Sequence, residues 1–305
     1  MSDPRIISLL PSGTEVVAAL GLSGYLVGRS HECDYPVEVQ LLPICSEPKY
    51  PSEGSSPEIN RAVEEVLQDA LSIYKVDIEL IKSLQPTHII TQSQCEVCAV
   101  STDELQEALD NYINDQVITV VDLNPESMDH IYNDIHRIAE ALSVNREGER
   151  VVEEMKLGFS ELKLKTSDLY KPSVAHVEWI EPIMVAGHWT YDLIDMAGGL
   201  NTFPDENKRW IDFEELLKVN PEKLVIAPCG FSIEKTLSEM HFLTEKNGWD
   251  TLNVVVHGEV YISDGNQYFN RSGPRLTDSA EILAEIFHPQ LGNGHEGAGW
   301  IRYIE

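Results

Sequence analysis

The feature that most constrains the fold is a repeated alternation between short apolar runs and stretches with helical periodicity. The first run, Arg5–Leu10, ends at Pro11 and indicates a buried strand. Ser12-Gly-Thr then offers N-cap candidates for a helix over Glu15–Leu20, which Gly21 closes. Strands alternating with helices are typical of a parallel sheet with helices on both faces. The pattern predicts further strands at Tyr25–Val27, His88–Thr91, Val117–Val121, Val174–Trp179, Leu224–Ala227 and Val260–Ser263.

Helices fill the segments between these runs. The apolar spacing predicts one that opens at Ser56, another over Ile78–Leu84 that ends before Pro86, and others around Leu105, over Tyr191–Ala197 and over Ile233–Glu239. The longest helical pattern covers Met128 to about Leu164, with apolar residues three and four apart. We therefore expect an N-terminal α/β lobe over residues 1–127, an interlobe helical segment over 128–166 and a C-terminal α/β lobe over 167–305. A chain of 305 residues is long enough for two cores.

Charge and composition exclude several classes of function. Lys and Arg total 22 against 51 for Asp and Glu, a formal charge of −29, so the field of the chain repels nucleic acid and anionic bilayers. We expect no membrane insertion, because no run reaches 18 apolar residues. The N-terminus lacks a signal-peptide pattern, so the sequence as written predicts a cytoplasmic protein, or a periplasmic or extracellular one if a signal peptide was removed. A monomer is expected.

The cysteines are few and odd in number: Cys33, Cys45, Cys95, Cys98 and Cys229. No disulfide framework is implied. Cys95 and Cys98 have the spacing of zinc knuckles, and Cys33 with His31 could complete a tetrahedral zinc set. The second close-spaced pair of a structural zinc site is missing, so small apolar wall residues are the alternative. We expect the three thiols to border one site, because loops after parallel strands meet at one edge of the sheet.

Five segments at predicted strand ends resemble the cobalamin-binding branch of the solute-binding proteins of ABC importers. They are Arg5-Ile-Ile-Ser-Leu-Leu-Pro-Ser-Gly-Thr-Glu, Gly28-Arg-Ser-His-Glu-Cys-Asp-Tyr-Pro, Thr91-Gln-Ser-Gln-Cys-Glu-Val-Cys-Ala-Val, Val185-Ala-Gly-His-Trp and Arg271-Ser-Gly-Pro-Arg-Leu. The resemblance implies the class III fold, in which two α/β lobes, each with a central, mostly parallel sheet, are joined by one long helix. It further implies a corrinoid bound in the cleft between the lobes and no catalytic residue or cofactor.

The predicted ligand contacts come from these segments and from aromatic residues of the second half. Large rings suit a bulky macrocycle, since each buries ~150–250 Å² when covered. A thiolate or imidazole could also reach the cobalt. The set is Ser12, His31, Glu32, Cys33, Gln92, Cys95, Cys98, Trp179, His188, Trp189, Tyr268, Phe269 and Arg271. The family docks its ABC permease through one acidic residue per lobe, and the matching positions are Glu79 and Glu214.

Two other functions stay open. A ferric siderophore or haem is a comparable bulky chelate, but an anionic siderophore requires several cations, and only Arg29 and Arg271 lie in the predicted loops. A metal- or thiol-dependent enzyme would use Cys33, Cys95, Cys98 and His31. No phosphate-binding glycine motif, nucleophile elbow or His-Glu-x-x-His pattern is present. These absences favour a binding protein over an enzyme.

Overall fold

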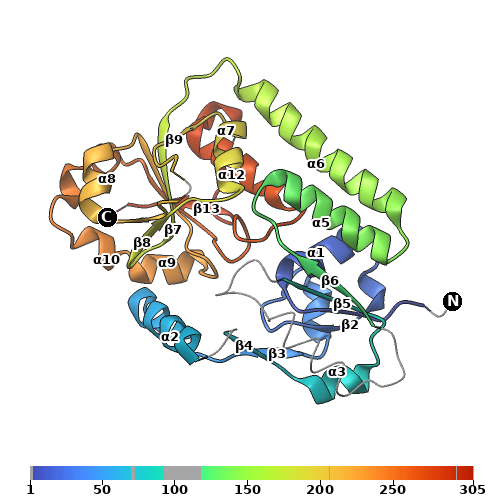
Figure 1. Cartoon of the computed structure of the whole chain (residues 1–305). Helices are drawn as coiled ribbons and strands as arrows, with labels where there is room; N and C mark the ends of the chain where they lie inside the picture. The colour runs from blue at the N-terminus through green and yellow to red at the C-terminus, as the bar shows by residue number, and fades with distance from the viewer. Residues whose placement is uncertain (1–2, 70–72, 93–117, 206, 293, 305) are drawn as a thin grey trace. The chain divides into compact units, whose positions relative to one another are not determined.

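The computed structural model describes residues 3–69, 73–92, 118–205, 207–292 and 294–304 (Figure 1). The chain divides into two compact units. The N-terminal unit comprises Met1–Gly54 and Arg61–Glu154, and the C-terminal unit comprises Ser55–Asn60 and Met155–Glu305. Among the described residues, no helix combines the length and the apolar character that a bilayer crossing requires.

The N-terminal unit is built on a parallel sheet with strand order β2-β1-β5-β6. Its two central strands carry Ile6, Ile7, Ile89 and Ile90, all 0% exposed, as expected for strands that helices cover on both faces. A separate antiparallel pair joins β3 and β4. The elements are β1 (Ile6–Ser8), α1 (Pro11–Ala19), β2 (Leu26–Arg29), β3 (Ser46–Pro48), β4 (Tyr74–Val76), α3 (Ile78–Leu84), β5 (His88–Gln92), β6 (Thr119–Leu123) and α5 (Met128–Ala141).

Helix α1 begins four residues earlier than the sequence predicts. Pro11 occupies its first turn and Leu10 its N-cap, so the predicted capping residue Ser12 lies inside the helix. Proline suits this place because its missing N–H would have no helical partner there. Ser12 is consequently buried, 5% exposed.

The C-terminal unit contains a larger, mixed sheet with order β10-β8-β7-β11-β12-β13, to which β9 adds beside β7. Its centre, β7-β11-β12, is parallel, whereas β8, β10 and β13 run antiparallel to their neighbours. The strands are β7 (Ser173–Trp179), β8 (Ile183–Val185), β9 (Leu200–Asn201), β10 (Trp210–Ile211), β11 (Lys223–Ile226), β12 (Val260–Ser263) and β13 (Trp300–Arg302). The helices are α7 (Thr190–Met196), α8 (Phe213–Val219), α9 (Ile233–Glu239), α10 (His241–Thr244), α11 (Asn253–Val256) and α12 (Leu276–Phe287).

The helical stretch predicted as one connector is two helices, α5 and α6 (Asn145–Thr166). The break falls at Leu142–Val144, where Ser143 has a left-handed backbone, φ 59°. Serine and asparagine favour such ends because their side chains compete with the helix for backbone hydrogen bonds. The boundary between the units lies within α6, between Glu154 and Met155.

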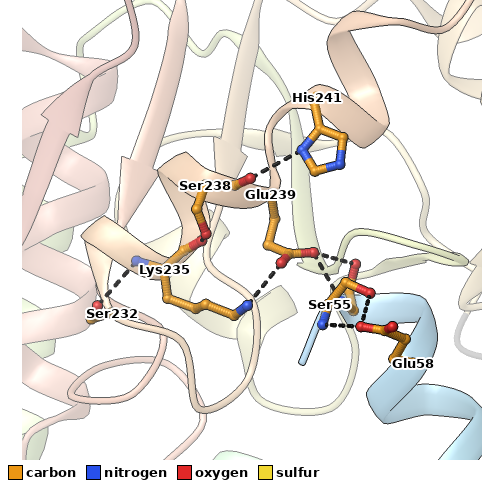
Figure 2. A network of polar contacts seen from close by, with 8 residues as sticks. Ser55, Glu58, Ser232, Lys235, Ser238, Glu239 and His241 are labelled. Atoms are coloured by element: carbon orange, nitrogen blue, oxygen red, sulfur yellow. Dashed lines mark hydrogen bonds and ion pairs between the residues drawn. The ribbon is translucent and has the colours of Figure 1, made fainter. Parts of the chain in front are cut away.

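Helix α2 (Ser56–Asp69) also crosses that boundary, between Asn60 and Arg61. Its first residue is held inside the C-terminal unit: the Ser56 backbone N and Oγ donate to Glu239 Oε2 over 2.8 and 3.1 Å. Lys235 donates to the other oxygen of the same carboxylate over 2.8 Å (Figure 2). Farther along α2, Val63, Val66 and Leu67 pack on the core of the N-terminal unit.

Candidate functional site

In the N-terminal unit, the parallel strands bring several predicted contacts to one edge of the sheet. Ser12 lies in the first turn of α1, which follows β1, the His31–Cys33 segment follows β2, and Gln92 is the last residue of β5. Cys95 and Cys98, which come after Gln92 in the sequence, lie outside the described residues.

Arg29, at the end of β2, organises the loop that follows. It is buried, 8% exposed, and its guanidinium donates to the backbone carbonyls of Ser30, His31, Cys33 and Gln40 over 2.9–3.4 Å. From the sequence, Arg29 is expected only as a cation of this loop. Its observed role is to satisfy carbonyls of the chain that would otherwise be buried without a partner.

His31 and Glu32 belong to a polar cluster with Ser46 and Tyr74, two residues that were not predicted as contacts from the sequence. His31 Nδ1 lies 3.1 Å from Ser46 Oγ, and the imidazole meets the Tyr74 ring edge-on at 5.0 Å. Tyr74 in turn donates its hydroxyl to Glu32 over 2.8 Å. Burial lowers the pKa of His31 in spite of the neighbouring Glu32 carboxylate. A neutral imidazole can act as a hydrogen-bond partner or a metal ligand.

The described cysteines differ in environment. Cys33 is 1% exposed, and Thr14 Oγ1 donates to its sulfur over 3.0 Å. Cys45 is also buried, and burial raises the pKa of its thiol to about 11. Cys229 is exposed. The zinc set of Cys33, Cys95, Cys98 and His31 stays a prediction, because two of its members lie outside the described residues.

In the C-terminal unit, the loops after β7, β11 and β12 are joined to one another. Trp179 and Phe231 pack with ring centroids 5.1 Å apart. The backbone N of Cys229 donates to Glu178 O, and that of Asn266 donates to Phe231 O. Gly265 is required at the last of these loops, because a Cβ there would overlap the carbonyl oxygen of Pro228. The carboxyl edge of the sheet therefore bears a connected group of loops that includes the predicted ring of Trp179.

His188 and Trp189 do not follow a parallel strand; they come after β8, which runs antiparallel to β7. They nevertheless meet the β12 loop: Trp189 Nε1 donates to the Phe269 carbonyl over 2.7 Å. His188 is exposed and has a left-handed backbone, φ 51°, a conformation that is unfavourable for a residue with a side chain. The convergence of parallel strand ends does not explain the position of this pair. The hydrogen bond from Trp189 to Phe269 explains it.

A buried ion pair supports the turn that carries His188 and Trp189. The Glu178 carboxylate, which lies on β7, pairs with Arg209 and accepts a hydrogen bond of 2.8 Å from Thr190 Oγ1. Burial raises the pKa of Glu178 although the Arg209 charge opposes that rise. Gly187 leaves room for the guanidinium, because a Cβ there would overlap Arg209. The glycine in Val185-Ala-Gly-His-Trp is the one signal in the sequence for this arrangement.

The remaining predicted contacts lie deeper than expected. Phe269 is 1% exposed, and its ring packs on His176 with centroids 4.9 Å apart. Arg271 is 5% exposed and donates to Asn266 Oδ1 over 3.3 Å. Tyr268 is half-buried beneath the guanidinium of Arg275, 5.0 Å from the ring centroid. Phe269 and Arg271 thus have packing roles within the unit, and ligand contact by them stays a prediction.

The two predicted docking residues are both exposed, and each lies in the first turn of a short helix. Glu79 is the second residue of α3, with 82% of its side chain exposed, and pairs with Lys82 at 2.8 Å. Glu214 is exposed on α8. One exposed carboxylate per unit agrees with the predicted pattern without testing it.

Comparisons with known proteins identify the family of the chain. A family model described as periplasmic binding protein matches residues 6–266. An uncharacterized ABC transporter substrate-binding lipoprotein, YvrC of Bacillus subtilis, is 26% identical over 93% of this chain and 80% of its own. A vitamin B12-binding protein of Vibrio cholerae is 22% identical over 91% of this chain and 86% of its own.

Solved structures share the fold. The periplasmic vitamin B12-binding protein BtuF of Vibrio cholerae has a TM-score of 0.67 at 20% identity, with 95% of this chain and 98% of that one covered. A periplasmic heme-binding protein from Pseudomonas aeruginosa has a TM-score of 0.71 at 17% identity, with 94% of each covered. The α/β class III architecture is confirmed, whereas neighbours of both ligand types leave the ligand open.

Proposed function

Because the chain belongs to the periplasmic binding protein family, we propose that it binds a corrinoid and serves as the substrate-binding component of an ABC importer. Proteins of this family bind solutes for transport. The cobalamin branch is favoured by the sequence segments quoted above and by similar proteins named for vitamin B12. The interlobe cleft predicted as the binding place stays a prediction.

One observation carries the choice of ligand. The two cations predicted for the site, Arg29 and Arg271, are buried and bind atoms of their own loops. An anionic chelate needs cations that face it, because a carboxylate is costly to desolvate without a charged partner. The side chains of the described loops that are accessible to solvent include the exposed His188 and the half-buried rings of Trp179 and Trp189. Such a surface suits a large ligand with amide edges better than one rich in carboxylates.

The direct test is a titration of the full chain with cyanocobalamin, haem and a ferric siderophore, followed by calorimetry and by visible absorption after gel filtration. We expect sub-micromolar binding of the corrinoid, which corresponds to more than ~8 kcal/mol. Haem is the second candidate, favoured by the exposed His188, whose imidazole could bind iron. If haem shows a Soret shift and no cobalamin gives heat, the ligand is haem and not a corrinoid.

Two tryptophan variants of the same unit sharpen this test. Trp189→Ala removes a half-buried ring from the proposed site, so we expect corrinoid affinity to fall at least ~10-fold, about 1.4 kcal/mol. Trp210→Ala is the matched control, because Trp210 is 51% exposed on the edge strand β10. Equal affinity in both variants would contradict a role for Trp189 in binding.

Docking to a permease is the second part of the proposal. Glu79 and Glu214 are exposed carboxylates, one in each unit, and we expect them to pair with cations of a partner. Charge reversal of both residues to lysine should abolish stimulation of the cognate transporter while corrinoid affinity stays unchanged. Undiminished stimulation would show that docking uses other residues.

A further inference from the structure

A group of potential metal ligands lies in the C-terminal unit, among residues that the proposed function does not use. Asp278, Glu281 and His295 each offer one ligand atom, and these atoms lie within 4.8 Å of one another. The two carboxylates are three residues apart on α12, a spacing that places them on one face of the helix. The histidine comes from the segment that leads to β13.

The imidazole of His295 is fixed in orientation by a residue outside this group. Its Nδ1 lies 2.9 Å from Glu285 Oε1, and its backbone N also donates to the Glu285 carboxylate. Trp300 Nε1 donates to Oε2 of the same carboxylate over 2.8 Å. A carboxylate can only accept here, so Nδ1 carries the proton and Nε2 is left with its lone pair. Metal-binding histidines in proteins are held by a carboxylate in this way.

We propose that Asp278, Glu281 and His295 Nε2 bind a divalent transition-metal ion of the zinc type, with Glu285 as the residue that orients the histidine. A mixed set of one imidazole and two carboxylates suits Zn²⁺, whereas Mg²⁺ and Ca²⁺ prefer oxygen ligands alone. Zinc holds such ligands at about 2.0–2.2 Å, so the three atoms need to move together by only a small distance. Glu281 is exposed and can make that movement.

The environment of Asp278 is compatible with an ion. Arg275 Nε lies 3.8 Å from Asp278 Oδ2, a long ion pair. The Arg275 guanidinium also donates to Gln267 Oε1 over 3.1 Å and covers the Tyr268 ring. Its charge is therefore shared among several partners. A bound ion would tie α12 to the segment before β13 and stabilise the unit, since a ligand that binds only the folded state raises its melting temperature.

The experiment is a calorimetric titration of zinc chloride into the full chain after treatment with a chelator, without any corrinoid. Wild type is compared with the triple variant D278N/E281Q/H295Q and with a matched control, E149Q/E161Q/H257Q, which removes two exposed carboxylates and one exposed imidazole elsewhere. We expect the control to bind like wild type and the triple variant to lose one zinc equivalent, or at least ~10-fold in affinity. Zinc held by the cysteines would be the same in all three proteins, so the difference isolates this site.

Further readouts separate a metal site from general attraction of cations to an acidic chain. Zinc should raise the melting temperature of wild type and of the control variant but not that of the triple variant. Glu285→Gln should weaken zinc binding by about 10–100-fold. Should the triple variant fail to fold without metal, the single change E281Q at an exposed position replaces it. Equal zinc binding by the two triple variants overturns the proposal, and this result is independent of whether a corrinoid binds.

Discussion

Gly265 lies where two loops of the candidate site come closest, and its missing side chain is what permits the approach. A Cβ there would overlap the carbonyl oxygen of Pro228, which is backbone and has little room to move. We expect Gly265→Ala to destabilise the C-terminal unit by about 1–3 kcal/mol and to weaken ligand binding. All tryptophans of the chain lie in this unit, so denaturant unfolding followed by tryptophan fluorescence reports it directly.

Gly158→Ala, in α6 of the same unit, is the control for that experiment, because a Cβ there would make only an ordinary contact with Thr277, at 3.5 Å. It should not destabilise the unit and should add up to about 1 kcal/mol, since alanine favours a helix interior over glycine. Equal stability of the two variants would mean that the β11 and β12 loops separate at no cost.

His176 is a second residue with a measurable energetic signature. It is 0% exposed on β7, neither ring nitrogen has a hydrogen-bond partner among the described residues, and burial lowers its pKa to about 3. In the unfolded chain, this imidazole binds a proton near pH 6.5, whereas in the folded chain it stays neutral at that pH. Stability is therefore full above pH 6.5 and falls as the pH drops from 6.5 toward 3, by about 2 kcal/mol at pH 5.

Replacement of His176 by leucine tests this linkage. The variant should unfold at a similar urea concentration at pH 7 and should lose about 2 kcal/mol less than wild type between pH 7 and pH 5. The tryptophan signal of the same unit provides the measurement. Parallel pH profiles for the two proteins would show that His176 gains its proton without unfolding.

At the scale of elements, the start of α2 depends on a carboxylate from another helix. Glu239 is 3% exposed and accepts from the backbone N and the hydroxyl of Ser56, which is 0% exposed (Figure 2). Glu239→Ala would leave these donors buried without their partner, at a cost of about 1–3 kcal/mol. Glu234→Gln, on the exposed face of the same helix, should cost almost nothing. Equal urea midpoints for the two variants would argue that water replaces the carboxylate.

The elements that could be predicted are those with a strong local pattern. The strands β7, β11 and β12 and the helices α7 and α9 lie within one residue of their predicted bounds, because each is an apolar run or a periodic helix between clear breakers. Helix α12 is missed because its start carries no capping signal: Arg275 occupies the N-cap and makes no side-chain cap hydrogen bond. The two-residue strands β9 and β10 depend on pairing with distant partners and leave no local pattern.

The candidate site also has parts that could be predicted from the sequence and parts that could not. Its loops after the parallel strands could be placed from the order of elements, because parallel strands share one carboxyl edge. The support beneath His188 could not, since the Glu178–Arg209 pair joins residues that are 31 positions apart. The depth of Phe269 and Arg271 was equally hidden, because only the folded loop determines that one ring packs on His176 and that one guanidinium faces Asn266.

For the whole molecule, the net charge of −29 provides a test of the ligand that needs no substitution. An anionic chelate must approach against this field, and salt screens that repulsion as the Debye length falls from about 30 Å at 0.01 M to about 8 Å at 0.15 M. A corrinoid without net charge experiences little of it. We therefore expect corrinoid affinity to change by less than about two-fold across this range of NaCl, because no cation–anion contact is broken and no repulsion is relieved. Haem or a ferric siderophore, if bound, should bind more tightly as salt rises. Calorimetric titrations at both ionic strengths give the comparison, and a marked salt dependence of cobalamin binding would mean that charged groups of the chain face the ligand after all.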